Sequence, residues 1–168
     1  YVMPATGGEP RRIARGGGSP QFNADGSRVF YFTGGGAAKK LMSVGLNGEE
    51  PREVFSFKYP TLVSVSPDGK WVAWTELFNA YVAPLPATGA SIELSKDTKS
   101  IPVAKVSRDV GSYLHWSADS SRLHWAVGDE YFSSELKELF AFVPGAPKTL
   151  PKVEDAKGVR LGLSQPVY

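Results

Sequence analysis

The stretch that decides the fold is SPDGKWVAW, from Ser66 to Trp74. Apolar residues lie on both sides of Pro-Asp-Gly, which is a strong signal for a tight turn. An Asp side chain can bond to its own backbone and Gly accepts a positive φ, so the stretch predicts a strand, a turn and a second strand. The next question is whether it forms one isolated hairpin or one copy of a repeat.

The stretch belongs to one of three similar segments. PQFNADGSRVFYF begins at Pro20, LVSVSPDGKWVAW at Leu62 and YLHWSADSSRLHW at Tyr113. With their turn aspartates in register, apolar residues recur before the turn, after it and two positions later, on one face of each strand. These aligned sets are Phe22, Val65 and Trp116, then Val29, Val72 and Leu123, then Tyr31, Trp74 and Trp125. Ser120 stands where the other two segments have Gly, which makes the third turn the weakest match.

A second element recurs between these hairpins. Copies begin at Tyr1, Leu41, Ala80 and Leu139, and each has a short apolar strand, a turn with Gly or Pro, and another short strand. Together the two elements predict a unit of four strands. The turn aspartates lie 43 and 51 residues apart, and a four-stranded repeat of about 40 to 50 residues is typical of a propeller blade.

The expected fold is therefore all-β, a β-propeller fragment of about three to four four-stranded blades. We expect the end of a blade in residues 1–15, blades in 16–58, 59–108 and 109–158, and an exit strand or linker toward a further domain in 159–168. Closed propellers usually have four to eight blades, so this fragment is an open arc. Its exposed faces predict a protein partner, either the rest of a parent chain or a second copy.

Two parts of the sequence resemble known families. Ser-Pro-Asp-Gly followed by an aromatic residue, with Tyr-Val-x-Pro-x-x-Gly, resembles the repeat of TolB-type β-propellers, which is also found in the tricorn protease and in several bacterial hydrolases. His115 to Phe142, together with KGVRLGLSQPVY at the end of the chain, is similar to the last blade and exit strand that precede a metal-dependent amidohydrolase domain.

The resemblance implies a non-catalytic propeller portion of an amidohydrolase-like hydrolase, which controls substrate access or assembly. Two alternatives stay open: a stand-alone TolB-like module that binds protein or peptide in the periplasm, and the gating propeller of a serine peptidase. The resemblance also implies a periplasmic or extracytoplasmic location. Fold alone does not decide among these functions.

Composition excludes several other classes. The chain of 168 residues has 19 Lys and Arg against 17 Asp and Glu, a net charge of +2. This excess is too small and too scattered to predict a nucleic-acid partner. There is no cysteine, which excludes disulfides, thiolate zinc sites and a cysteine nucleophile. No apolar run reaches the roughly 18 residues of a membrane helix, so we expect no membrane insertion.

Both histidines, His115 and His124, lie in the third hairpin. If its turn consists of Asp119 and Ser120, the two imidazoles face each other directly, and two imidazoles on one face can hold a metal. The aligned positions in the other hairpins have no ligand chemistry, and no third ligand lies at a suitable spacing. A structural pair is therefore the favoured interpretation.

The tryptophans offer a second candidate surface. Trp74, Trp116 and Trp125 share the repeating apolar face, which predicts packing between blades. Trp71 is out of phase with Val72, so we expect it to be partly exposed as a candidate contact for a ligand. The sequence has no Gly-x-Ser-x-Gly motif. We assign no catalytic residue, metal ligand or cofactor to this chain.

Overall fold

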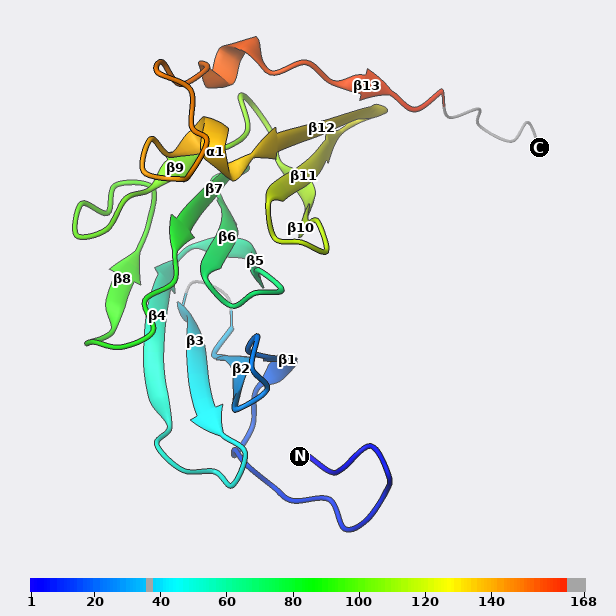
Figure 1. The fold of residues 1–168 in the computed structure, drawn as a ribbon, viewed down its shortest axis with the longest axis vertical. Helices are drawn as coiled ribbons and strands as arrows, with labels where there is room; N and C mark the ends of the chain where they lie inside the picture. The colour runs from blue at the N-terminus through cyan, green and yellow to red at the C-terminus, as the bar shows by residue number, and fades with distance from the viewer. Residues whose placement is uncertain (36–37, 163–168) are drawn as a thin grey trace.

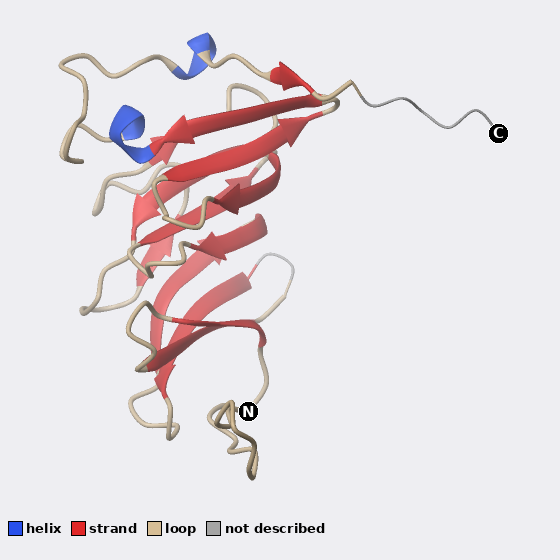
Figure 2. Ribbon diagram, turned by 45° about the vertical axis from the view of Figure 1, so that its right-hand side comes forward, coloured by secondary structure: helices blue, strands red, loops and turns tan. Residues whose placement is uncertain are grey.

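The computed structural model of the chain describes residues 1–35 and 38–162. Its regular structure is almost entirely β, in three sheets that follow one another along the long axis of the molecule (Figure 1, Figure 2). Among the described residues, the helical elements are α1 (Leu136–Leu139) and a 3-10 turn (Val153–Asp155). Three successive sheets, each opened by one Asp hairpin, form the predicted β-propeller fragment.

The first sheet has the strand order β1-β2-β3-β4-β8. Its strands are β1 (Gly18–Phe22), β2 (Arg28–Thr33), β3 (Ala38–Gly45), β4 (Arg52–Lys58) and β8 (Ile92–Leu94). The first four strands pair antiparallel in chain order, as expected for one blade.

The fifth strand of this sheet corrects the predicted pairing. The segment from Ala80 was expected to form a hairpin within the second blade, but its second strand, β8, runs parallel to β4 of the first sheet. The physical reason lies in its side chains, because Ile92 and the fully buried Leu94 pack into the core between the first two sheets.

The second and third sheets each have four strands. The order β5-β6-β7-β9 comprises β5 (Pro60–Val65), β6 (Trp71–Glu76), β7 (Asn79–Pro84) and β9 (Ala104–Lys105). The order β10-β11-β12-β13 comprises β10 (Ser112–Trp116), β11 (Arg122–Val127), β12 (Glu130–Glu135) and β13 (Val159–Arg160). In both sheets a strand of two residues forms the fourth position, after a long connection.

The predicted outer hairpin that begins at Leu139 is wrong. The segment from Leu139 follows α1 as a series of turns instead of two strands, because Pro144 and Pro147 cannot donate to a strand ladder. The fourth strand of the third sheet comes instead from Val159–Arg160, which were expected to lie in an exit strand. Residues 163–168 of that expected segment lie outside the described residues.

The first 15 residues also differ from the expected two strands. They contain a single bridge, in which Val2 and Arg11 exchange two hydrogen bonds of 2.8 Å. Gly7 and Gly8 between them both have positive φ, so the chain turns back early. The segment then crosses the outer face of the first sheet before β1 begins.

The three Asp hairpins share one hydrogen-bond pattern. In each turn, the Asp carboxylate accepts a bond from the backbone N–H two residues later, on Ser27, Lys70 and Ser121, at 2.9 to 3.0 Å. The residue two positions before each Asp accepts, through its side-chain oxygen, the N–H five residues after itself. These bonds satisfy the turn backbone, so the same loop forms in all three copies.

Two apolar cores hold the sheets together. Between the first and second sheets, Phe57 lies 6.3 Å from Trp74, measured between ring centroids. Between the second and third, Trp125 packs beside Val82 and stacks on Phe132 at 5.5 Å. Trp74 and Trp125 are 0% and 1% exposed. The predicted packing of aligned aromatic residues between neighbouring sheets is therefore confirmed.

The aligned apolar residues of the three hairpins point the same way along the arc. In the second sheet Val72 and Trp74 face the first sheet, and in the third Trp125 faces the second. The equivalent residues of the first sheet, Val29 and Tyr31, face away from the second sheet. The first sheet therefore presents an apolar outer face, and residues 1–18 cross it.

Candidate functional site

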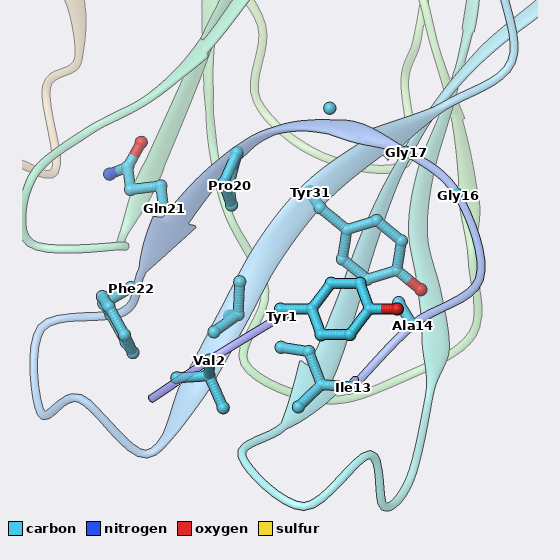
Figure 3. A pocket seen from close by; sticks show the side chains of 12 residues that line it. Tyr1, Val2, Ile13, Ala14, Gly16, Gly17, Pro20, Gln21, Phe22 and Tyr31 are labelled. Atoms are coloured by element: carbon cyan, nitrogen blue, oxygen red, sulfur yellow. The ribbon is translucent and has the colours of Figure 1, made fainter. Parts of the chain in front are cut away.

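The outer face of the first sheet contains a pocket of about 220 Å³ (Figure 3). Phe22 of β1 and Tyr31 of β2 line it on the side of the sheet, and Val2 and Ile13 of the N-terminal segment line it on the other side. Val29 of β2 also lines the pocket. The lining is mainly apolar, and its ionisable side chains are phenols. The pocket is suited to hold an apolar side chain.

Gly17 sets how closely the N-terminal segment approaches this face. It has a φ of 106°, and a Cβ atom at this position would lie 2.6 Å from the Tyr31 ring and 2.9 Å from the Phe32 carbonyl oxygen. Any larger residue would push the segment away from the sheet. The pocket therefore depends on glycine at this position.

His115 and His124 are directly opposed across β10 and β11, as expected from the register of the third hairpin. The turn itself is longer than two residues, since Ser117 and Arg122 still bond at its base, but the register is unchanged. The imidazole rings stack at 5.2 Å, and Tyr131 of β12 stacks on His124 at 5.5 Å. His115 also lies 6.1 Å from Tyr131, so the three rings form one compact cluster on the outer face of the third sheet.

The two imidazoles differ in their hydrogen-bond partners. His115 Nδ1 lies 2.7 Å from the Tyr113 carbonyl oxygen, so this nitrogen carries the proton and donates it, while Nε2 lies 3.4 Å from the Tyr131 hydroxyl. His124 Nδ1 is buried without a hydrogen-bond partner. Burial, and next the neighbouring His115, lowers the pKa of His124 below its ordinary value.

A metal would need more ligands than this pair. Within residues 1–35 and 38–162, no three His, Cys, Asp or Glu side chains are grouped closely enough to bind one. The ring faces of the two imidazoles lie against each other, so their in-plane lone pairs do not converge on a common point. The geometry supports a stacked structural pair.

Trp71 is half-buried, and it lies across the boundary between the second and third sheets. Its ring centroid lies 5.2 Å from Phe140 and 6.1 Å from Phe142, both in the turns after α1. These contacts attach the segment after α1 to the second sheet. The part of Trp71 that stays exposed lines a shallow hollow with Lys70 and Lys137.

The sequence reasoning missed a further exposed surface. Tyr59, Leu77, Phe78 and Tyr113 are all exposed, and we refer to these four residues as the aromatic rim. The available signal was TELFNAY, residues 75–81, in which a hairpin turns at Leu-Phe without any Gly, Asn or Asp between the strands. Bulky residues at such a turn are unusual, and this would have pointed to the surface.

No described helix is long and apolar enough to cross a membrane. No family model matches the chain. Two curated proteins are similar to it: dipeptidyl-peptidase 5 of Aspergillus oryzae and probable dipeptidyl-peptidase 5 of Aspergillus flavus, each 26% identical over 143 residues. These matches cover 77% of this chain but 19% of each peptidase. The chain thus spans about a fifth of the length of these relatives.

Solved β-propeller structures show partial similarity. Nidogen in its complex with laminin covers 77% of this chain and 49% of its own, with a TM-score of 0.47 and 19% identity. The structure described as TolB from Agrobacterium tumefaciens covers 70% of this chain and 42% of its own, with a TM-score of 0.43 and 21% identity. The fold itself rests on the three stacked sheets and their hairpins: this chain is a β-propeller fragment.

Proposed function

We propose that the chain is the non-catalytic propeller portion of a larger hydrolase, in which it controls substrate access or holds the assembly together. One observation carries this proposal. The aromatic side chains of the repeat are used in packing sheet on sheet, and the arc ends in an apolar face that residues 1–18 cross. Such an arc stacks on further modules and presents its rims to substrates or partners.

Two hydrolase classes fit this role. The resemblance of residues 115–142 to the last blade before an amidohydrolase domain supports a metal-dependent parent. The similarity to dipeptidyl-peptidase 5 supports a peptidase, in which the propeller would gate access of peptides. A periplasmic or extracytoplasmic address is part of the proposal, together with protein as the partner. A stand-alone interaction module remains the alternative to both.

The product of the complete gene distinguishes these classes. A serine-reactive fluorophosphonate should label a peptidase parent, whereas a chelator should inactivate an amidohydrolase parent. In either case, mass spectrometry should find the label, or the metal ligands, outside residues 1–168. A covalent label within these residues would contradict the non-catalytic role, and a gene product without hydrolase activity would favour the stand-alone module.

Control of access makes a separate prediction about substrate size. The parent should hydrolyse short peptides or small amides and leave folded proteins intact, because a propeller arc admits only what passes its rims. If the parent hydrolysed a protein equally well in its folded and unfolded states, this result would contradict the gating role.

A further inference from the structure

The turn between β6 and β7 is built from residues that its geometry disfavours. Glu76 pairs with Asn79, so Leu77 and Phe78 form a two-residue hairpin turn with φ values of 48° and 73°. Positive φ at both central positions is the geometry in which Asn-Gly is strongly preferred. A bulky residue in this region costs about 1 kcal/mol or more. Retaining two of them therefore points to a use for their side chains.

The other two residues of the aromatic rim have the same property. Tyr59 and Tyr113 both have a φ of 56°. Of the seven non-glycine residues with positive φ among the described ones, the four bulky apolar or aromatic ones are the members of this rim. Their exposed fractions are 58% for Tyr59, 59% for Leu77, 76% for Phe78 and 81% for Tyr113. Unfavourable backbone and exposed apolar side chains thus coincide at all four.

Pairing brings the four together at one end of the second sheet. Tyr59 precedes Pro60, which pairs with Glu76, the residue before the Leu77-Phe78 turn. On the other side, the Phe78 carbonyl accepts a 2.9 Å hydrogen bond from the Gly111 N–H, two residues before Tyr113. The backbone positions of the four residues therefore lie near one another, at neighbouring strand ends and turns of the second and third sheets.

Two lysines near the rim in sequence are without an ion-pair partner among the described residues, whereas the carboxylates of Glu76, Asp109 and Glu130 are buried or ion-paired. Lys58 precedes Tyr59 and has no ion-pair partner within the described part of the chain, and Lys105 there donates only to the carbonyl of Arg108. The carboxylate of Asp109 is already paired with Arg108 at 2.7 Å. Glu76 is 5% exposed and accepts bonds inside the protein. A complementary partner therefore carries carboxylates.

We propose that the aromatic rim binds a protein segment in which apolar side chains alternate with carboxylates. Leu77 and Phe78 would supply the apolar contact, with Lys58 and Lys105 at its edge. Exposed aromatic residues beside cations form the energetic centre of many protein interfaces. The inference rests on the rim itself and not on the hydrolase proposed above.

The test uses a replacement that should improve the fold while it removes the surface. The double variant Leu77→Asn, Phe78→Gly gives the turn its preferred sequence, so the full chain should melt about 2–4 °C higher. The probe is a labelled peptide alternating Leu and Phe with Glu, measured by fluorescence anisotropy. Its affinity for the variant should fall by about tenfold or more.

Controls separate the rim from other surfaces. Met3→Ser removes a comparably exposed apolar side chain, 56% exposed, that lies outside both the rim and the pocket lining, and it should leave binding unchanged. Lys58→Glu with Lys105→Glu should weaken binding, most strongly at low salt. A peptide with Lys in place of Glu should bind poorly to the wild-type chain.

Several results would overturn the proposal. Three of them concern the peptide: the wild-type chain does not bind it, the turn variant binds it equally well, or the Lys peptide binds as tightly as the Glu peptide. The fourth is self-association of the wild-type chain that the turn variant abolishes, because a second copy of the chain would then be the partner. If the turn variant fails to fold by circular dichroism, Tyr113→Ser decides in its place, because it removes the most exposed ring and leaves the turn intact. Loss of hydrolase activity in the parent has no bearing on these binding measurements.

Discussion

Ser120 has a φ of 62° and is 3% exposed, in the turn position where the other two hairpins have glycine. Its hydroxyl accepts a 2.9 Å hydrogen bond from the backbone N–H of Asp68 in the neighbouring turn. The side chain thus joins two sheets at their turns, and this favourable bond opposes the unfavourable backbone conformation.

Two substitutions at Ser120 should separate these effects. Ser120→Ala keeps the unfavourable φ and leaves the Asp68 N–H without its partner, so it should lower the free energy of unfolding by about 1–3 kcal/mol. Ser120→Gly loses the same bond but relaxes the backbone, so its loss should be smaller. Urea unfolding of both variants measures which of the two is less stable. A glycine variant less stable than the alanine variant would show that the backbone is not strained.

His124 should make stability depend on pH near neutrality. Its pKa in the folded chain lies below the ordinary 6.5 because burial and His115, with Arg122, disfavour the imidazolium, against a smaller opposite effect of Asp119. The unfolded chain therefore takes up a proton first. The contribution of neutral His124 to the free energy of unfolding is therefore complete above about pH 6.5, and it is lost as the pH falls toward the pKa of His124 in the folded chain.

Urea unfolding between about pH 5 and 7.5 tests this dependence. The wild-type chain should lose stability over this range, and His124→Gln should have a flatter profile. A variant profile as steep as that of the wild type would assign the effect to other groups. The carboxylate of Asp119, whose pKa is lowered to about 2 first by its bond from Ser117 and then by bonds from Ser121, stays charged throughout this range and therefore does not contribute to the slope.

At the scale of the element, β6 carries two tryptophans with different surroundings. Trp74 is fully buried between the first two sheets and donates its indole N–H to Glu76 at 3.2 Å. Trp71 packs on Phe140 and Phe142 beyond the opposite face and keeps part of its surface in solvent. The odd spacing between them places them on opposite sides of the strand.

Replacing each tryptophan should therefore give unequal losses. Trp74→Ala should lower the free energy of unfolding by about 3–5 kcal/mol, since it leaves a cavity and removes one of the two hydrogen bonds that the buried Glu76 carboxylate accepts. Trp71→Ala should cost about 1–2 kcal/mol and loosen the segment after α1. Denaturant unfolding measures the losses, and limited proteolysis near Phe142 measures the loosening. Equal losses would contradict the assignment of Trp74 to a closed core.

Element pairing shows where sequence reasoning stopped. The hairpins around Asp25, Asp68 and Asp119 were predictable, because their turn chemistry and alternation are local. The partners of β8 and β13 were not, since strands of two or three residues carry too little pattern to choose a neighbour. Their pairing depends on which sheet offers a free edge and an apolar contact.

At the scale of the whole molecule, the first sheet has an apolar outer face that the N-terminal segment partly covers. A chain lacking residues 1–15 should expose Val29 and Tyr31, and should therefore bind more of a hydrophobic dye and associate at high concentration. Dye fluorescence and light scattering measure this, with Tyr31→Lys in the shortened chain expected to reverse it. A shortened chain that stays monomeric and dye-free would show that the face needs no cover.

The sequence by itself determined the all-β repeat, the three Asp hairpins and the aromatic residues that pack between sheets, and it offered the opposition of His115 and His124 as one of two possible registers. Each of these follows from turn chemistry or from period-two alternation within one hairpin, which are local properties of the chain. Tertiary structure alone decided the partners of the short outer strands, the link from Ser120 to Asp68, and the assembly of Tyr59, Leu77, Phe78 and Tyr113 into one rim. These depend on which segments distant in sequence meet in space, and that is settled by packing and by the satisfaction of backbone hydrogen bonds across the whole arc.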